Sequence, residues 1–87
     1  MQIQFSERGM DDYISWQNED RKTLKKINQL LKDISRNPFD GIGKPEPLKG
    51  NFSGYWSRRV NDKDRLIYRF QDSVIYIFSL KGHYGDK

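Results

Sequence analysis

The 87-residue chain carries 16 basic and 12 acidic residues, a net charge of +4, and its length suits one domain over residues 1–87. It has no cysteine and one histidine, which excludes disulfides and disfavours a transition-metal site, so we expect no metal and no cofactor. No apolar run approaches the ~20 residues that span a membrane, and residues 1–20 lack the order of a signal peptide, which predicts a cytoplasmic protein with no membrane partner.

The N-terminal segment predicts a short strand followed by a helix. Residues 2–5 have the pattern of a strand. Ser6 is suited to cap the helix that follows, and Gly9 weakens that helix by ~1 kcal/mol relative to alanine. The residues that we expect on its inner stripe are Met10, Tyr13 and Ile14.

A second helix is predicted over residues 21–36, ended by Asn37-Pro38 because the residue before proline avoids the helical region. Apolar residues recur along it at steps of three and four. They are Leu24, Ile27, Leu30, Leu31 and Ile34. The segment has six basic residues against one acidic, whereas residues 1–20 have one against five. Such a basic stretch suits a polyanion or an acidic protein partner, but a solvated helix face is the favoured interpretation. The lysines concerned are Lys22, Lys25, Lys26 and Lys32.

Residues 39–53 have the composition of a loop, because glycines and prolines recur along them. Lys44, Glu46 and Lys49 alternate with prolines that fix the backbone. The predicted loop is therefore stiffer than a linker and able to hold a side chain in place.

Residues 55–60 and 65–70 predict the two arms of a β-hairpin. A three-residue loop, residues 61–63, places Arg59 opposite Arg65, and a register shifted by one residue would mix charge into the core face. With this register one face is nearly all apolar, comprising Trp56, Arg58, Val60, Leu66, Tyr68 and Phe70. The other is cationic with an aromatic at its edge, comprising Tyr55, Ser57, Arg59, Arg65, Ile67 and Arg69.

A last strand is predicted over residues 74–80, in the interior of a sheet because its centre is apolar on both faces. After a turn at residues 71–73, we expect Phe70 opposite Val74 and Ser79 opposite Arg65. This pairing puts Tyr76, Phe78 and Leu80 on the core side.

Several residues have the chemistry needed for RNA cleavage. A base removes the proton of a ribose 2′-OH, the oxygen attacks the adjacent phosphate, and an acid protonates the departing 5′-oxygen. Arginine suits the pentacoordinate phosphate because its fork donates to two oxygens. The candidates are Glu46, Lys49, Arg59, Arg65, His83 and Tyr84. His83 lies ~13 Å beyond Ser79 on a straight strand, and Gly82 offers the bend that would bring it back. From spacing alone, solvated or structurally paired side chains remain an alternative.

Several segments together carry a family resemblance. They are Asp11-Asp12-Tyr13 with Trp16, Lys25-Lys26-Ile27-Asn28, Asn37-Pro38-Phe39, Gly43-Lys44-Pro45-Glu46-Pro47-Leu48-Lys49, Ser53-Gly54-Tyr55-Trp56-Ser57-Arg58-Arg59, Arg65-Leu66-Ile67-Tyr68 and His83-Tyr84. In these segments, and over nearly its whole length, the chain resembles the YoeB/Txe toxins of bacterial toxin-antitoxin pairs, a branch of the RelE/ParE superfamily. The tail Gly85-Asp86-Lys87 extends beyond the point at which such toxins end.

The resemblance implies an α+β fold, the RelE/ParE-like toxin fold, in which two N-terminal helices pack on a small curved, mainly antiparallel β-sheet. It implies a ribosome-dependent, metal-free endoribonuclease, an mRNA interferase that cuts messenger RNA in the ribosomal A site and inhibits translation. Glu46 would be the general base, His83 the general acid and Arg65 the stabiliser of the phosphorane. The substrate-binding residues implied are Lys49, Arg59 and Tyr84.

The implied partners are an acidic YefM/Axe-like antitoxin, the bacterial 70S ribosome with its messenger RNA, and a second copy of the chain in a homodimer. Two alternatives stay open. A ParE-type toxin that inhibits gyrase by protein contact shares the fold but needs no constellation of Glu46, Arg65 and His83. A basic RNA- or protein-binding module would bind phosphate with steep salt dependence and leave RNA intact.

Overall fold

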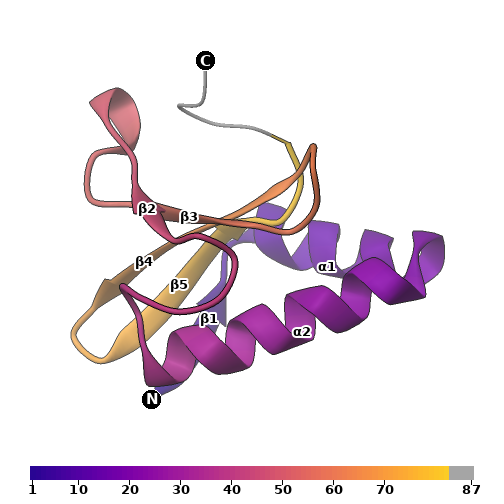
Figure 1. Cartoon of the computed structure of the whole chain (residues 1–87), viewed down its shortest axis with the longest axis horizontal. Helices are drawn as coiled ribbons and strands as arrows, with labels where there is room; N and C mark the ends of the chain where they lie inside the picture. The colour runs from indigo at the N-terminus through magenta and orange to yellow at the C-terminus, as the bar shows by residue number, and fades with distance from the viewer. Residues whose placement is uncertain (83–87) are drawn as a thin grey trace.

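The computed structural model describes residues 1–82 and shows two layers, a five-stranded sheet with two helices on one of its faces (Figure 1). The strands are β1 (Gln2–Phe5), β2 (Glu46–Pro47), β3 (Trp56–Arg59), β4 (Arg65–Gln71) and β5 (Val74–Ser79). The helices are α1 (Glu7–Glu19) and α2 (Arg21–Arg36), and η1 (Gly50–Phe52) is a short 3-10 helix. The expected α+β fold, with both N-terminal helices on one face, is confirmed.

The sheet has the strand order β1-β5-β4-β3-β2. Only the β1–β5 pair is parallel, and the other described pairs are antiparallel, so the sheet is mainly antiparallel as expected. Strand β5 lies between β1 and β4, which confirms its predicted interior place. No helix within residues 1–82 has the length and apolarity to cross a membrane.

Helix α1 begins after Ser6, whose side-chain oxygen accepts a hydrogen bond from the Gly9 N–H at 2.9 Å, as predicted. Its predicted inner stripe is wrong at two positions, because Met10 and Ile14 are 42% and 49% exposed. The helix instead rests on β5 through Gly9, where an added Cβ would lie 2.6 Å from the Ile77 carbonyl oxygen. This backbone approach turns Met10 and Ile14 outward, so Gly9 is needed for packing.

Helix α2 has the predicted bounds, and Asp20 caps it by accepting from the backbone N–H groups of Lys22 and Thr23. Three residues of its apolar stripe are fully buried, whereas Leu24 and Leu31 pack at the edge of the core. The buried core comprises Trp16, Ile27, Leu30, Ile34, Val60, Leu66, Tyr68, Ile75, Ile77 and Leu80. This core fills the space between the helices and one face of the sheet.

The β3–β4 hairpin has the predicted register, with Arg59 opposite Arg65. The Val60 N–H donates to the Asp64 carbonyl at 3.0 Å, which closes a three-residue loop. Inside that loop the Asn61 side-chain oxygen accepts from the backbone N–H groups of Lys63 and Asp64 at 2.8 and 2.7 Å. The turn forms because asparagine can satisfy the backbone locally.

The predicted β4–β5 pairing is wrong by one residue. Asp72 and Ser73 form a two-residue turn with positive φ at both positions, 53° and 64°. Such turns match the right-handed twist of the strands that they join. Phe70 therefore pairs with Ile75, not with Val74.

This register puts Ile75 and Ile77 in the core, whereas Tyr76 and Phe78 belong to the opposite face. A bulge then shifts the pairing between Ile67 and Tyr68, and it returns Leu80 to the core. Ser79 lies opposite Ile67 instead of Arg65. The sequence pattern could not show this bulge because both faces of the strand are apolar.

Residues 39–53 are not a loop throughout, since Glu46–Pro47 form β2 and Gly50–Phe52 form η1. Glu46 pairs with Ser57 and Pro47 with Trp56 at the edge of the sheet. Proline is tolerated there because an edge strand leaves one side of its backbone unpaired. The short strand fixes Glu46 in the sheet register.

Candidate active site

Glu46 and two arginines project from the face of the sheet opposite the helices, which we call the open face. Glu46 lies opposite Ser57 in β3, so the two side chains share this face. Arg59 is two residues beyond Ser57 and thus a diagonal neighbour of Glu46, at about 7 Å. Arg65 lies opposite Arg59 in β4. Three neighbouring strands therefore bring one carboxylate and two guanidinium groups to one region.

Arg65 is held firmly beside the hairpin turn. It is 9% exposed, and its NH1 donates to the carbonyl oxygens of Asn61 and Asp64 at 2.9 and 3.1 Å. The Arg65 backbone N–H donates to the Gly82 carbonyl at 3.0 Å, and the Gly82 N–H donates to Asp64 Oδ1 at 2.8 Å. Gly82 has a φ of 87°, in the left-handed region. The chain is thereby tied next to Arg65 one residue before His83.

The other predicted site residues are Lys49, His83 and Tyr84. Lys49 is exposed and immediately precedes η1, three residues after Glu46. It lies on the segment by which the chain leaves β2. His83 and Tyr84 lie outside the described residues. Glu46, Arg59 and Arg65 are therefore the three predicted residues that the described sheet brings together.

The open face is not cationic throughout, unlike the expectation from the hairpin pattern. Phe52, Tyr55 and Phe78 form an aromatic cluster with ring centroids 5.5–6.0 Å apart. Ile67 in the same face is fully buried. Arg69 lies with its guanidinium 5.5 Å from the Tyr55 ring centroid. The site thus occupies the end of this face near the hairpin turn, and Arg69 lies four residues away along β4.

Ser79 is a feature of this face that the sequence did not reveal. Its side-chain oxygen is the one buried side-chain polar atom without a hydrogen-bond partner among residues 1–82. It lies opposite Ile67 because of the bulge in β5. Its sequence signal was one serine in an apolar strand.

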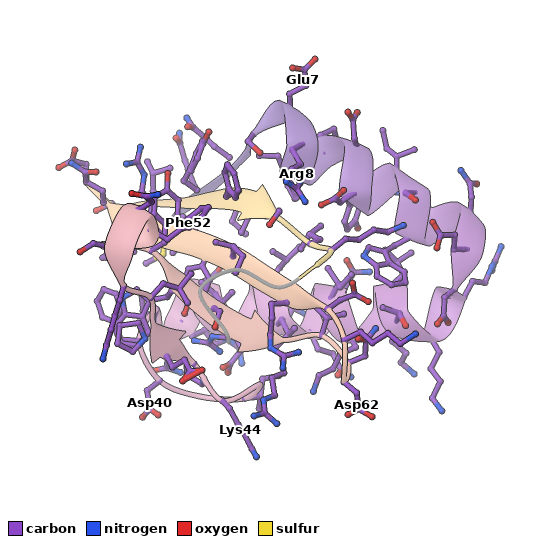
Figure 2. All side chains as sticks on the ribbon, turned by 90° about the horizontal axis from the view of Figure 1, so that it is seen from above. Glu7, Arg8, Asp40, Lys44, Phe52 and Asp62 are labelled. Atoms are coloured by element: carbon purple, nitrogen blue, oxygen red, sulfur yellow. The ribbon has the colours of Figure 1, made fainter. Side chains whose placement is uncertain are left out.

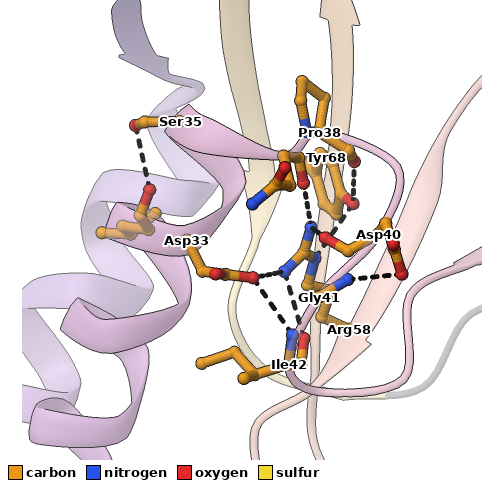
Figure 3. A network of polar contacts seen from close by, with 10 residues as sticks. Asp33, Ser35, Pro38, Asp40, Gly41, Ile42, Arg58 and Tyr68 are labelled. Atoms are coloured by element: carbon orange, nitrogen blue, oxygen red, sulfur yellow. Dashed lines mark hydrogen bonds and ion pairs between the residues drawn. The ribbon is translucent and has the colours of Figure 1, made fainter.

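Arg58 organises the segment that leads to Glu46 (Figure 3). Its guanidinium is fully buried and uses all five N–H groups. NH1 donates to Asp33 Oδ2 at 2.6 Å, and Nε donates to the Tyr68 hydroxyl at 3.2 Å. The remaining acceptors are the backbone carbonyls of Asn37, Asp40 and Ile42. The sequence placed Arg58 on the core face but gave no sign of this network.

The network has a defined charge state near neutral pH. The hydrogen bond from Arg58 lowers the pKa of Asp33, so this carboxyl is ionised. Burial raises the pKa of Tyr68, which keeps its hydroxyl neutral and able to donate to the Pro38 carbonyl at 2.6 Å. A buried cation is thus balanced by one anion and by oriented backbone dipoles.

The segment that Arg58 holds, residues 37–42, leads directly to the site. The Gly43 carbonyl accepts a hydrogen bond from the Arg59 backbone N–H at 2.7 Å, and the Glu46–Ser57 pairing follows. Arg58 therefore fixes the segment before Glu46 from the helix-facing side of the sheet, while pairing with β3 fixes Glu46 itself. Within residues 1–82, no group of three or more His, Cys, Asp or Glu side chains is arranged to hold a metal ion.

Two helices on one face of a small sheet, with a carboxylate and arginines on the other, define a small basic α+β protein suited to binding a phosphodiester. Comparison with known proteins gives the family. Residues 5–84 match the family model of the YoeB-like toxin of bacterial type II toxin-antitoxin systems. The chain belongs to this family of toxins.

Curated relatives agree over nearly their full lengths. The chain is 55% identical to Toxin YoeB of Synechocystis sp. over 84 residues, which cover 97% of this chain and 98% of that toxin. It is 51% identical to Toxin YoeB of Streptomyces coelicolor, with 97% of this chain and 100% of that toxin covered.

Solved structures show the same fold. A YoeB/ParE toxin from Agrobacterium tumefaciens superposes with a TM-score of 0.93 at 41% identity, covering 97% of this chain and 100% of that chain. The Staphylococcus aureus YoeB dimer gives 0.90 at 50% identity, and the toxin in the heterotetrameric YoeB-YefM complex of that organism gives 0.88 at 50%. Both comparisons cover 97% of this chain and 98% of the other.

Proposed function

We propose that this toxin is a ribosome-dependent endoribonuclease that cuts messenger RNA in the ribosomal A site and so inhibits translation. The observation that carries the proposal is the shared face of Glu46, Arg59 and Arg65, with Gly82 tied to Arg65 just before His83. Membership of the toxin family supports the biological role. Such a toxin acts where ribosomes are, in the bacterial cytoplasm.

The proposed reaction needs a base, an acid and a stabiliser of negative charge. Glu46 removes the proton of the 2′-OH, and the oxygen attacks the adjacent phosphorus. His83 protonates the departing 5′-oxygen, which leaves a 2′,3′-cyclic phosphate on the upstream fragment. Arg65 donates to the pentacoordinate phosphate, which gains charge in the transition state.

The remaining groups bind the substrate. Arg59 neutralises phosphate from the strand next to Arg65, and Lys49 does so from the segment after Glu46. Tyr84 shapes the site around the scissile base. The fixed position of Arg65, which donates to two carbonyls of the turn, limits its reorganisation on binding, and preorganised donors of this kind contribute most to electrostatic catalysis.

We infer two protein partners for this chain. The relative from Staphylococcus aureus has been solved as a complex with YefM and as a YoeB dimer. An acidic YefM/Axe-like antitoxin and a second copy of the toxin are the corresponding partners here. The positive net charge of this chain suits an acidic antitoxin.

The test is primer extension on a messenger RNA in a purified translation system, with and without ribosomes. Wild-type toxin should give a discrete cut at the A-site codon only with ribosomes, and Glu46→Ala and His83→Ala should give none. Glu7→Ala, which removes an exposed acid on α1, should cut normally. Intact RNA under all conditions would contradict the proposal and favour gyrase inhibition or simple binding.

A further inference from the structure

A hollow lies beside the proposed catalytic residues, where α2, the segment before β2 and the β3–β4 turn meet. Three cationic residues line it, Lys26, Lys44 and Arg59, together with one acidic residue, Asp62. Lys44 and Asp62 project at the same edge of the molecule in Figure 2. These side chains come from separate elements, so only the folded chain assembles them.

Lys26 differs from the other lysines of α2. It is half-buried, whereas Lys22, Lys25 and Lys32 are exposed. The sequence favoured one solvated face for all four. In the structure, the side of α2 that carries Lys26 faces the segment before β2, and Lys26 lines the hollow together with Lys44 and Arg59.

The backbone on this side of the hollow is closely constrained. An added Cβ at Gly43 would lie 2.7 Å from Leu30 Cδ2, and the Gly43 carbonyl accepts from the Arg59 N–H. Lys44 follows with a φ of 52°, which is uncommon for a residue with a side chain. Such strained positions persist only where the surrounding structure enforces them. Lys44 and Arg59 are therefore held relative to each other before any ligand binds.

The charge in the hollow is not balanced locally. Within residues 1–82, no ion pair joins Asp62 or another acid to Lys26, Lys44 or Arg59. Three cations against one acid leave a positive concave surface. Lysine and arginine in such a concavity favour a phosphate group, because they supply several donors and oppose its charge.

Arg59 belongs both to this hollow and to the open face that carries Glu46 and Arg65. A polyanion bound at Arg59 therefore reaches the hollow without a gap. This continuity favours a nucleic-acid backbone, whose charges repeat along the chain, over a single small anion.

We propose that the hollow is a second phosphate site, in which Lys26 and Lys44 bind an RNA backbone phosphodiester next to the one that is cut. The identity of the ligand as messenger or ribosomal RNA rests on the proposed function, whereas the binding of a phosphate group rests on the charges that line the hollow. The phosphate belongs either to the messenger or to ribosomal RNA, and binding measurements distinguish the two.

The test compares Lys26→Met with Lys32→Met, since methionine keeps most of the apolar stem of lysine and removes its charge. Each variant is titrated with a single-stranded RNA blocked by 2′-methoxy groups, and separately with ribosomes that have a vacant A site. For the oligonucleotide, Lys26→Met should weaken binding about three- to tenfold at low salt. It should also reduce the slope of log K against log salt by about 0.7, the share of one phosphate contact.

The control Lys32→Met should bind like the wild type, and Lys26→Arg should restore the slope. If Lys26→Met loses affinity for the oligonucleotide, the phosphate belongs to the messenger. If it loses affinity for ribosomes alone, the phosphate belongs to ribosomal RNA. Equal behaviour of Lys26→Met and Lys32→Met on both ligands would overturn the proposal. A loss of affinity confined to an acidic antitoxin peptide, titrated as a third ligand, would also overturn it, because the hollow would then bind protein.

Unfolding curves show whether Lys26→Met is folded, and Lys26→Gln provides a second neutral variant if it is not. Because no cleavage is measured, this experiment is separate from the test of the nuclease. A toxin that binds RNA through Lys26 but never cuts it would refute the proposed function and leave the phosphate site in place.

Discussion

Arg58 in β3 donates a hydrogen bond to Asp33 in α2 over 2.6 Å, and no part of the arginine side chain reaches solvent. This ion pair joins the sheet to the second helix. The same guanidinium holds three carbonyls of residues 37–42, so the helix end and the segment leading to Glu46 depend on one side chain. Removing one member of such a pair leaves a charge without its partner.

Arg58→Lys should therefore destabilise the protein even though the charge is kept. An ammonium group has three donors and no fork, so at least two of the five acceptors lose their partner. We expect a loss of about 3 kcal/mol in the free energy of unfolding, measured by urea denaturation. Arg59→Lys, at the exposed neighbouring position, should change the free energy of unfolding by less than about 0.5 kcal/mol. Equal effects of the two would show that the network is not needed for stability.

Asp33 should make the free energy of unfolding depend on pH in the acidic range. Its folded-state pKa is lowered by the Arg58 hydrogen bond, so its contribution is present above the unfolded pKa of about 3.9 and is lost as pH falls through the folded value. The urea concentration at the unfolding midpoint of the wild type should therefore decrease as the pH is lowered below about 4. Asp33→Asn should be less stable at neutral pH and should lose part of this acid dependence. A variant with the full wild-type pH profile would refute the assignment.

Gly9→Ala should destabilise the protein although alanine favours helix. The added Cβ would meet the Ile77 carbonyl oxygen at 2.6 Å, so α1 must shift away from β5. We expect a loss of about 1–3 kcal/mol, as for other overpacked sites. Gln17→Ala, exposed on the same helix, should be neutral or slightly stabilising by thermal unfolding. An increase in melting temperature for Gly9→Ala would mean that the close contact is absent.

The β4–β5 turn should be improved by residues that prefer positive φ. Asp72 and Ser73 both adopt such angles, and Asn-Gly is the pair that two-residue turns of this kind favour. The double variant Asp72→Asn, Ser73→Gly should be more stable by about 1 kcal/mol in urea denaturation. The reverse test is Ser73→Val, which should be clearly destabilising because β-branched residues avoid this region. Indifference to both changes would contradict the turn.

The proposed reaction also makes a prediction about the substrate. A messenger with a 2′-methoxy group at the cut position should not be cleaved, because the attacking oxygen carries no removable proton. The same group placed two nucleotides downstream should leave cleavage intact. Fragment analysis by gel electrophoresis measures both. A cut at the blocked position would require another nucleophile and would exclude Glu46 as the base that activates the 2′-OH.

The sequence by itself determined the elements whose signals are local. The stripe from Leu24 to Ile34 and the stop at Asn37-Pro38 gave the bounds of α2, because helical period and proline geometry act within a few turns. The register of the β3–β4 hairpin was also predictable, since asparagine satisfies the turn and alternation separates the two faces. The same alternation placed Arg59 and Arg65 side by side.

The tertiary structure decided what depends on contacts between distant segments. β2 is only two residues long and forms because β3 pairs with it, which puts Glu46 beside Arg59. The bulge in β5 was hidden because apolar residues occupy both faces of that strand. Gly9 packs against the Ile77 carbonyl of β5, and the buried Arg58 guanidinium donates to five acceptors from other segments. A sequence pattern records the preferences of one segment, whereas such contacts arise only when folding fixes two segments against each other.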